Sequence, residues 1–445
     1  MTLRRLLLMS GLIAALAAES FASTRLPGFR PSDLGLLVID PSDLRTLNAA
    51  VTIDADAIKQ AHAAMKQYQQ AVQEGSRNVL ASMDAMEPPG AAAAFQHEQQ
   101  REKMVERVRE QIEVRRSNGE FQGNPAALRE AWQEAMDEAQ RDIDRAHRDT
   151  ANVPGWSDAF QRQAAALAEW YETKDGLSAA LQQELLAIVT TEQSPEVTQW
   201  WLHARLGSAM SRGRLSGEVH HPFESDFQRT DASDLALQSW AQRHIELIDA
   251  RDDAIRRVPL VAADAIERSH LNLYRDAVYD AMAYREAVRD HANEGVDLIT
   301  VLLDDVAARA FVELSRKKAY PGIWKSDRAM RAVTAALQAS TLDAAQKGQL
   351  GALRIEHRQL SDDLCTRHLD AVWEEEGRRL ADQEVQRVVV FFGDAEFVVR
   401  PTPMLDGSVS ERRTLSDDTM ERLRGILTDE QWQLIPGTRT APERD

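Results

Sequence analysis

Apolar side chains recur at intervals of three and four residues along most of the chain, which is the period of an amphipathic helix. Leu128, Trp132, Met136, Ala139 and Ile143 illustrate the pattern. It predicts an all-α fold with long helices. Besides the helix around 128–143, the predicted helices run over about 41–48, 54–86, 92–117, 157–189, 195–212, 231–257, 261–316, 326–339 and 343–382.

One segment departs from this period. Residues 385–400 contain the runs Val388–Phe392 and Phe397–Val399, which are rich in β-formers, around the turn signal Gly393-Asp394. We therefore expect a small β-hairpin near 385–400. Helix is the alternative, because an isolated hairpin is marginal in water and the rest of the chain is helical.

The stretch from Thr428 to Gln431 has the composition of a helix start. A Thr followed three residues later by Gln forms a capping box, in which each side chain bonds the other residue's backbone N–H. Leu427 and Trp432 flank it at the spacing of a hydrophobic staple. Similar patterns predict capped helix starts at Asp40, Asp54, Asn124, Ser194 and Asp343.

Two distant segments look like copies of each other. Residues 177–193 and 415–431 align without a gap at an offset of 238, and seven of the 17 positions are identical. Chance gives about one identity over this length, so we interpret them as an internal repeat. Each copy reads as a helix that starts at Ser178 or Ser416, ends, and turns into a second helix. The predicted signature of this corner is carried by Thr190, Gln193, Thr428 and Gln431.

A second similarity relates residues 55–68 to residues 263–274. Both contain Ala-Asp-Ala-Ile followed by a histidine in step, His62 in one and His270 in the other. We expect these histidines to pack or hydrogen-bond at helix interfaces.

A linker is predicted at 213–227, where two Gly, one Pro and little periodicity occur. It divides the chain into two related helical modules, 23–212 and 228–445. Within the first module, residues 92–150 read as two narrow-striped, highly charged helices joined by a turn, a coiled-coil-like hairpin. We expect this hairpin to project or to pair with another subunit; solvated bundle helices are the alternative.

The first 22 residues have the features of a secretory signal peptide. Arg4 and Arg5 precede an apolar run from Leu6 to Ala18, and small residues lead to a cleavage point after Ala22. A membrane anchor is the alternative, but a span needs about 20 apolar residues and this run is shorter. We expect a bacterial periplasmic or secreted protein, with no membrane span after cleavage.

The net charge limits the classes of binding partner, and the cysteine content indicates the cellular compartment. The 445 residues include 71 Asp and Glu against 53 Lys and Arg, a net charge of −18. This balance disfavours nucleic acid as a partner, because phosphate binding needs a basic face. Cys365 is the only cysteine, so no internal disulfide exists and we expect a buried thiol. Export without disulfides suits a bacterial periplasm.

Candidate chemistry is sparse. The sequence has no nucleophile elbow, metalloprotease motif, P-loop or dinucleotide-binding motif, so we predict no catalytic residue and no cofactor. Cys365 and His368 share a helix face and, with Glu356-His357, are the best metal-ligand candidates. Two ligands do not make a site, because structural zinc needs four. His220-His221 lie in the predicted linker without other ligands nearby, so we predict no metal site.

The corner segments Val189–Gln193 and Leu427–Gln431 resemble the LTxxQ signature of periplasmic helical proteins of the CpxP/Spy type. The resemblance covers these motifs, the signal peptide and the helical composition. This chain is longer and more acidic than such proteins, and Val189 replaces the motif Leu. The resemblance implies an exported all-helical fold, a cradle-shaped dimer, and binding of unfolded clients or of a sensor kinase.

These observations together favour a non-enzymatic exported protein that binds protein or peptide partners, chaperone-like in the periplasm. One alternative is a structural envelope component that forms homo-oligomers through the hairpin at 92–150. Another is a metal-responsive periplasmic sensor.

Overall fold

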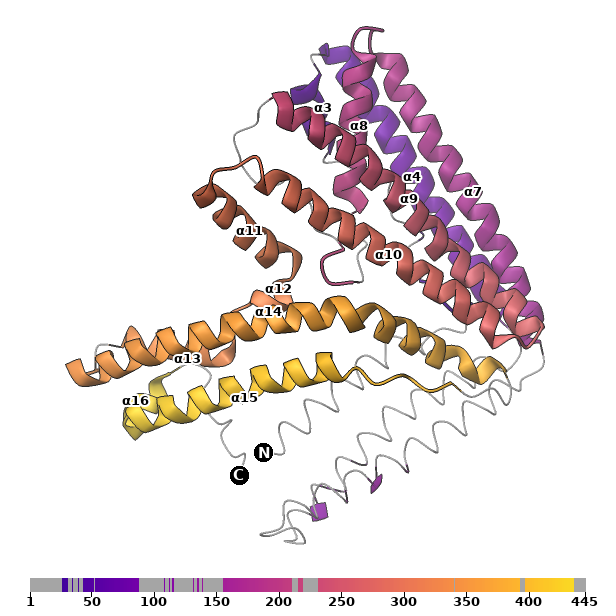
Figure 1. Cartoon of the computed structure of the whole chain (residues 1–445). Helices are drawn as coiled ribbons and strands as arrows, with labels where there is room; N and C mark the ends of the chain where they lie inside the picture. Colours follow the sequence, from indigo (N-terminus) through magenta and orange to yellow (C-terminus); the bar gives the residue numbers. More distant parts are fainter. Residues whose placement is uncertain are drawn as a thin grey trace. The chain divides into compact units, whose positions relative to one another are not determined.

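The chain is described by a computed structural model, in which twelve α-helices, one short 3-10 helix and no strand occur among the described residues (Figure 1). The predicted all-α class is confirmed. The described residues are 26–30, 34, 39, 43–51, 53–87, 155–209, 215–218, 231–339, 341–392 and 397–435, with isolated positions between 108 and 138.

The described chain forms two compact units whose segments interleave along the sequence. Unit 1 comprises Met1–Ser208, Asp249–Ala281 and Ala381–Val399; unit 2 comprises Ala209–Ile248, Met282–Leu380 and Arg400–Asp445. Three long helices contribute residues to both units: α9 (Asp231–Glu267), α10 (Leu271–Thr300) and α14 (Ala344–Val388). The division into modules 23–212 and 228–445 stays a prediction, because most of the linker at 213–227 lies outside the described residues.

Unit 1 is built around two long antiparallel helices that lie side by side, α4 (Ala55–Ala85) and α7 (Trp156–Ile188) (Figure 1). α4 starts at the predicted cap Asp54, whose carboxylate accepts hydrogen bonds from the N–H groups of Asp56 and Ala57. Its buried face recurs at the helical period: Ala57, Ala61, Ala64, Met65, Tyr68 and Val72.

The α4–α7 pair is held by close packing. Gly75 faces the ring of Trp170, and a Cβ at this glycine would lie 2.0 Å from that ring. Gln163 is fully buried; its Nε2 donates to the backbone oxygen of Met83 at 3.2 Å, and its Oε1 accepts from the N–H of Leu26 at 2.8 Å. This deeply buried amide is therefore satisfied by backbone groups.

Two shorter helices complete the start of unit 1, α3 (Leu44–Ala50) and α8 (Ser194–Ala209). Trp200 and Trp201 of α8 are buried, and Trp200 Nε1 donates to Thr46 Oγ1 at 2.9 Å. These tryptophans therefore close the core beside the corner at Thr190.

The β-hairpin predicted at 385–400 is wrong. α14 runs without a break into a 3-10 helix, η4 (Val389–Phe392), and no strand follows among the described residues. The ring of Phe391 lies edge-on to Trp156 and Phe160, at centroid distances of 6.0 and 5.4 Å. Burial of this apolar run against helices of unit 1 outweighs the β propensity of its Val and Phe residues.

Unit 2 contains parts of α9, α10 and α14 together with α11 (Asp305–Ala319), α12 (Pro321–Trp324), α13 (Arg328–Leu337), α15 (Pro403–Ile426) and α16 (Asp429–Leu434). α14 and α15 lie antiparallel and side by side (Figure 1). One apolar cluster joins α13, α14, α15 and α16; its best-buried members are Ala329, Ala332, Val333, Ala336, Leu350, Leu353 and Leu423.

The capping box predicted at Thr428 is present. Its Oγ1 accepts from the N–H of Gln431 at 3.3 Å, and Gln431 Oε1 accepts from the N–H of Thr428 at 3.0 Å. Leu427 and Trp432 belong to one apolar cluster, as the staple predicts. The Gln431 amide also pairs reciprocally with that of Gln346, at 2.9 and 3.1 Å, so the starts of α14 and α16 are joined.

The other copy of the repeat also turns between helices. α7 ends at Ile188 and α8 begins at Ser194, and between them Gln193 Oε1 accepts from the N–H of Thr190 at 3.0 Å. The identical positions are buried alike: Leu185 and Leu423 are buried, whereas Thr190 and Thr428 are exposed.

Two details of the predicted repeats are wrong. Ser178 and Ser416 do not start helices but lie inside α7 and α15; Ser178 Oγ donates to the backbone oxygen of Lys174, a bond available within a continuous helix. Residues 55–68 start α4, whereas residues 263–274 contain the end of α9 and the break at Ser269.

His62 and His270 are both exposed, so the expected packing at helix interfaces is also wrong. Their matching positions in sequence do not correspond to matching positions in the fold.

The predicted caps at Asp40 and Asn124 and the pair His220-His221 lie outside the described residues. Two larger predictions also fall wholly or mostly outside them. The signal peptide (1–22) lies wholly outside the described part, and the hairpin at 92–150 lies mostly outside it. The described positions within the hairpin are helical, and Val108 and Ile112 of its apolar stripe are buried. None of the described helices combines the length and apolar character that crossing a bilayer requires.

Candidate functional site

A groove of about 960 Å³ lies in unit 2, lined by α11, α13, α14 and residues 325–327. This volume is at the upper end of the usual range for ligand sites. Its basic lining residues are Arg309, Arg316, Lys317, Lys325, Arg354 and Arg358, and its acidic ones are Glu313, Asp327, Asp362 and Asp363. The apolar lining is Ala308, Val312, Trp324, Met330 and Ile355.

α11 presents one face to its own core and another to the groove. Phe311 is buried in a cluster with Val296 of α10. Arg309, Val312 and Arg316 follow at spacings of three and four and line the groove. The apolar anchor thus sets the rotation of α11 and presents its basic residues to the groove.

α14 forms the facing wall. Leu350 and Leu353 point into the apolar cluster shared with α15, which fixes the rotation of this helix. Arg354, Ile355 and Arg358 lie on the groove side and are exposed, and Ile355 retains 58% of its accessible surface. The large aliphatic side chain of Ile355 is therefore exposed to solvent beside the cations Arg354 and Arg358.

The charge of the groove is opposite to that of the chain. Its lining has six basic and four acidic side chains, whereas the chain has 53 basic and 71 acidic ones. Glu313 pairs with Lys317, whose hydrogen bond lowers the pKa of Glu313. Five basic side chains then remain against three acidic ones, Asp327, Asp362 and Asp363. Positive charge therefore predominates on the surface open to a ligand.

Three cations of the groove keep their charge unneutralised. Among the described residues, Arg316, Lys325 and Arg354 make no ion pair within the protein. Arg316 lies in the last turn of α11, where cations also complement the helix dipole. The helix dipole thus accounts for a cation at this position, and the Arg316 guanidinium can still bind a ligand.

His357 links the groove to the contact between α14 and α15. Its Nε2–H donates to Asp327 Oδ2 at 2.9 Å, and in the neutral ring Nδ1 accepts from the Thr419 hydroxyl at 2.8 Å. Burial raises the pKa of Asp327, but hydrogen bonds from His357 and from the N–H of Met330 outweigh it, and the pKa is lowered overall. Asp327 is also the N-cap of α13.

An Asp–His–Thr series has the order of a hydrolase triad, but its position argues against that chemistry. Thr419 is only 2% exposed and does not line the groove, so a substrate in the groove has no access to its hydroxyl. Asp327 and His357 instead tie α13 and α15 to α14. The arrangement fixes the floor of the groove.

Cys365 and His368, the best metal candidates in the sequence, do not converge. Cys365 Sγ donates to the backbone oxygen of Ile323 at 3.3 Å, and burial raises the pKa of its thiol. His368 Nδ1 donates to Ser408 Oγ at 2.7 Å, because the Ser408 hydroxyl itself donates to Leu405. No group of three potential metal ligands occurs among the described residues.

The two histidines belong to a regular ladder between α14 and α15 that the sequence analysis missed. His357–Thr419 and His368–Ser408 lie 11 residues apart on both helices, which is about three turns. Salt bridges repeat with the same spacing: Glu356–Arg422 at 2.7 Å and Arg367–Glu411 at 3.0 Å. The sequence signal that could have revealed this ladder is the recurrence of a charged residue followed by a histidine, Glu356-His357 and Arg367-His368, on one predicted helix.

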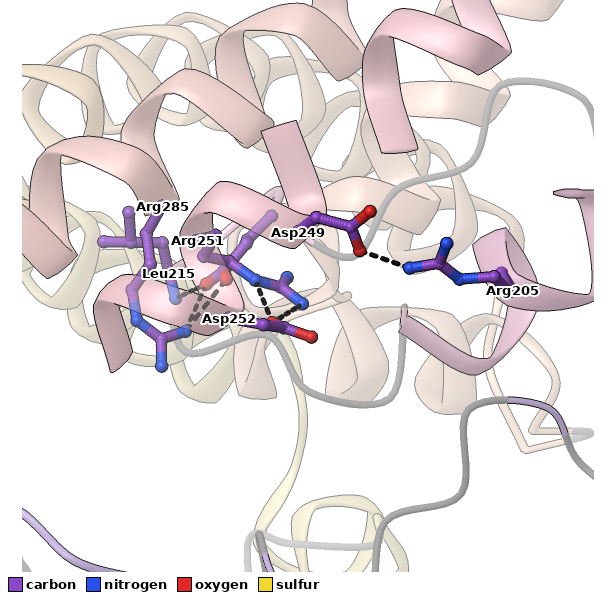
Figure 2. A network of polar contacts seen from close by, with 7 residues as sticks. Arg205, Leu215, Asp249, Arg251, Asp252 and Arg285 are labelled. Carbon is purple, nitrogen blue, oxygen red and sulfur yellow. Dashed lines mark hydrogen bonds and ion pairs between the residues drawn. The ribbon is translucent and has the colours of Figure 1, made fainter. Parts of the chain in front are cut away.

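Ion pairs form a second polar feature in each unit (Figure 2). In unit 2, Glu218 accepts from Arg285 at 2.8 Å and from the N–H of Leu215 at 3.0 Å, which fixes the turn at 215–218. In unit 1, Arg205 pairs with Asp249, and Arg251 pairs with Asp252 at 2.7 Å. These charges are mutually satisfied, so we assign them a structural role.

The corner residues have structural partners too. Thr190 and Gln193 bond each other, and so do Thr428 and Gln431. Gln431 also bonds Gln346, so the signature turns helices, and its residues do not line the groove of unit 2. A comparison with known proteins finds no matching family model, no matching curated protein and no matching solved structure.

Proposed function

We propose that this protein is an exported, non-enzymatic binding protein that holds segments of other proteins in the groove of unit 2, in a chaperone-like manner. The observation that carries the proposal is the lining of the groove, where exposed apolar side chains such as Ile355 lie beside cations without internal partners. Interfaces with protein segments combine an apolar anchor with charged surroundings in this way.

The reactive side chains at the groove favour binding over catalysis. His357 and Asp327 are bonded to each other and to neighbouring helices, and the Cys365 thiol is bonded to a backbone oxygen. A general base or nucleophile needs to reach a substrate proton or carbonyl within hydrogen-bond distance. Export rests on the features of residues 1–22, and chaperone-like activity on the resemblance of the corner motifs.

The proposal is tested by the aggregation of a chemically unfolded client, followed by light scattering without ATP. We expect the chain from residue 23, in several-fold molar excess, to suppress aggregation. Ile355→Asp should weaken this suppression, because it replaces an exposed apolar side chain of the groove with a negative charge. Leu360→Asp is the matched control: Leu360 is 46% exposed on the same helix and does not line the groove.

Absence of suppression by the unmodified chain would contradict the proposal. Equal losses in the two variants would place the activity elsewhere on the molecule. Circular dichroism of both variants checks that the helices are retained.

A further inference from the structure

We infer that the occupant of the groove is an acidic amphipathic segment of a protein partner. The inference rests on the proposed function and specifies the chemistry of the ligand. The groove offers cations on both of its long walls, Arg316 on α11 and Arg354 on α14, with Lys325 between α12 and α13. None of the three has an ion-pair partner within the described chain.

Unneutralised like charges around one groove favour an anionic ligand. They repel one another when the groove is empty, and a bound carboxylate replaces that repulsion with attraction. Because no internal salt bridge of these three cations has to break, the ligand meets the guanidinium and ammonium groups directly. Arginine is also suited to carboxylates, since its planar fork can make two parallel hydrogen bonds.

The apolar residues require that the ligand be amphipathic. Ile355 lies next to Arg354 in sequence, and Val312 lies one turn before Arg316 on the opposite wall. A segment with one apolar face and flanking carboxylates would bury Ile355 and reach cations on each side. A wholly acidic, extended chain would leave that aliphatic surface exposed.

The net charge of the molecule favours a short acidic segment over a long polyanion. The chain as a whole is strongly acidic, with a net charge of −18, whereas the groove lining has more basic than acidic side chains. A compact ligand feels mainly the groove, because charges farther than about 8–10 Å are screened at physiological salt. A nucleic acid or a long acidic polysaccharide would extend over the acidic remainder and be repelled.

Fluorescence anisotropy with three labelled peptides tests this inference on the full mature chain. Each peptide has 15 residues, the length of α11, with leucines at helical spacing and with Glu, Gln or Lys at the other positions. We expect the Glu peptide to bind about tenfold more tightly than the Gln peptide, and the Lys peptide to bind weakest. Raising the salt from about 0.1 to about 1 M should reduce this preference, because the screening length falls from about 10 to about 3 Å.

Charge reversal assigns the preference to the groove. Arg354→Glu should remove most of the preference for the Glu peptide and strengthen binding of the Lys peptide. Lys347→Glu, an equal charge change at an exposed position of α14 outside the groove, should change each Kd by less than about twofold.

The outcomes separate this inference from the proposed function. Equal binding of the Glu and Gln peptides would overturn the acidic ligand and leave peptide binding intact. Failure to bind any of the three peptides, together with failure to suppress aggregation, would overturn both. Tighter binding of heparin or a short RNA than of the Glu peptide would assign the groove to a polyanion, against the inference.

Discussion

The α4–α7 pair of unit 1 and the α14–α15 pair of unit 2 have the same geometry but different chemistry. Both are long antiparallel helices lying side by side (Figure 1). In the first, Gly75 lets the helices approach until one ring fills the space between them. In the second, hydrogen bonds and salt bridges such as His357–Thr419 and Arg367–Glu411 recur every three turns. One pair therefore depends on packing volume and the other also on protonation and salt.

The difference matters for the groove, because one of its walls is α14. The side chains that join α14 to α13 and α15 lie directly beneath the basic lining. Conditions that loosen this ladder should disturb the groove before they disturb the α4–α7 pair. Hydrogen exchange, read separately for peptides of the two pairs, measures each stability without assuming a single unfolding step.

Trp170→Ala should have the largest effect. It removes a buried ring from the α4–α7 contact, and such truncations cost about 3–5 kcal/mol. Exchange in α4 and α7 should rise steeply and equally at pH 7 and pH 5. A marked dependence of this loss on pH would contradict the view that the pair is held mainly by packing. Trp373→Ala, at a ring 39% exposed in unit 2, is the control and should leave α4 and α7 protected.

Acidification should selectively weaken the α14–α15 pair. Burial, assisted by Arg412 and Arg379, lowers the pKa of His368 from 6.5 to about 4. Between these values the unfolded chain binds more protons than the folded one, so stability falls as the pH drops from 6.5 towards 4. The full loss is about 3 kcal/mol.

His368→Asn tests that prediction. The Asn amide can still donate to Ser408, but it does not titrate. We expect the pH dependence of exchange in α14 and α15 to flatten in this variant. An unchanged profile would assign the acid sensitivity to other groups.

Gly75→Ala should be less costly than removal of the ring it faces. The added Cβ would lie 2.0 Å from the Trp170 ring, so one of the two must move, at a cost of about 1–3 kcal/mol. Combined with Trp170→Ala, the same methyl group enters an emptied space and should cost little. Additive losses in the double variant would show that the two residues do not compete for one volume.

Local features of the fold were predictable and distant ones were not. The capped starts at Asp54, Asp343 and Thr428 follow from spacings of three residues and are present. The β-hairpin at 385–400 was wrong, because the fate of that apolar run depends on Trp156 and Phe160, more than 200 residues earlier.

The groove could not be predicted for the same reason. Arg316 and Arg354 lie on different helices and face each other only through the packing of unit 2. Charged residues are common on every predicted helix, so nothing local distinguishes these two from solvated positions. Of the candidate chemistry, His357, Cys365 and His368 all lie on α14, but they do not converge, and each makes a separate hydrogen bond.

The smallest effects are expected at the two corners where α7 and α15 end. Thr428→Ala removes the acceptor for the N–H of Gln431 and should cost about 1 kcal/mol. At the other corner, the N–H of Gln193 donates to the backbone oxygen of Thr190. The Thr190 hydroxyl bonds the carboxylate of Glu192. The pKa of that carboxyl is lowered mainly by the hydrogen bond from its own backbone N–H and further by the Thr190 hydroxyl. Because α8 begins only at Ser194, Thr190→Ala should cost a few tenths of a kcal/mol.

Exchange at the first turns of α16 and α8 measures both losses, and Thr→Ser at each position is the control that keeps the hydroxyl. Equal losses at the two corners would mean that the hydroxyls have one role, as the identical sequence suggests. Unequal losses would mean that the same four-residue signature turns the chain in two ways, by a capping box at Thr428 and mainly through backbone and Gln193 bonds at Thr190.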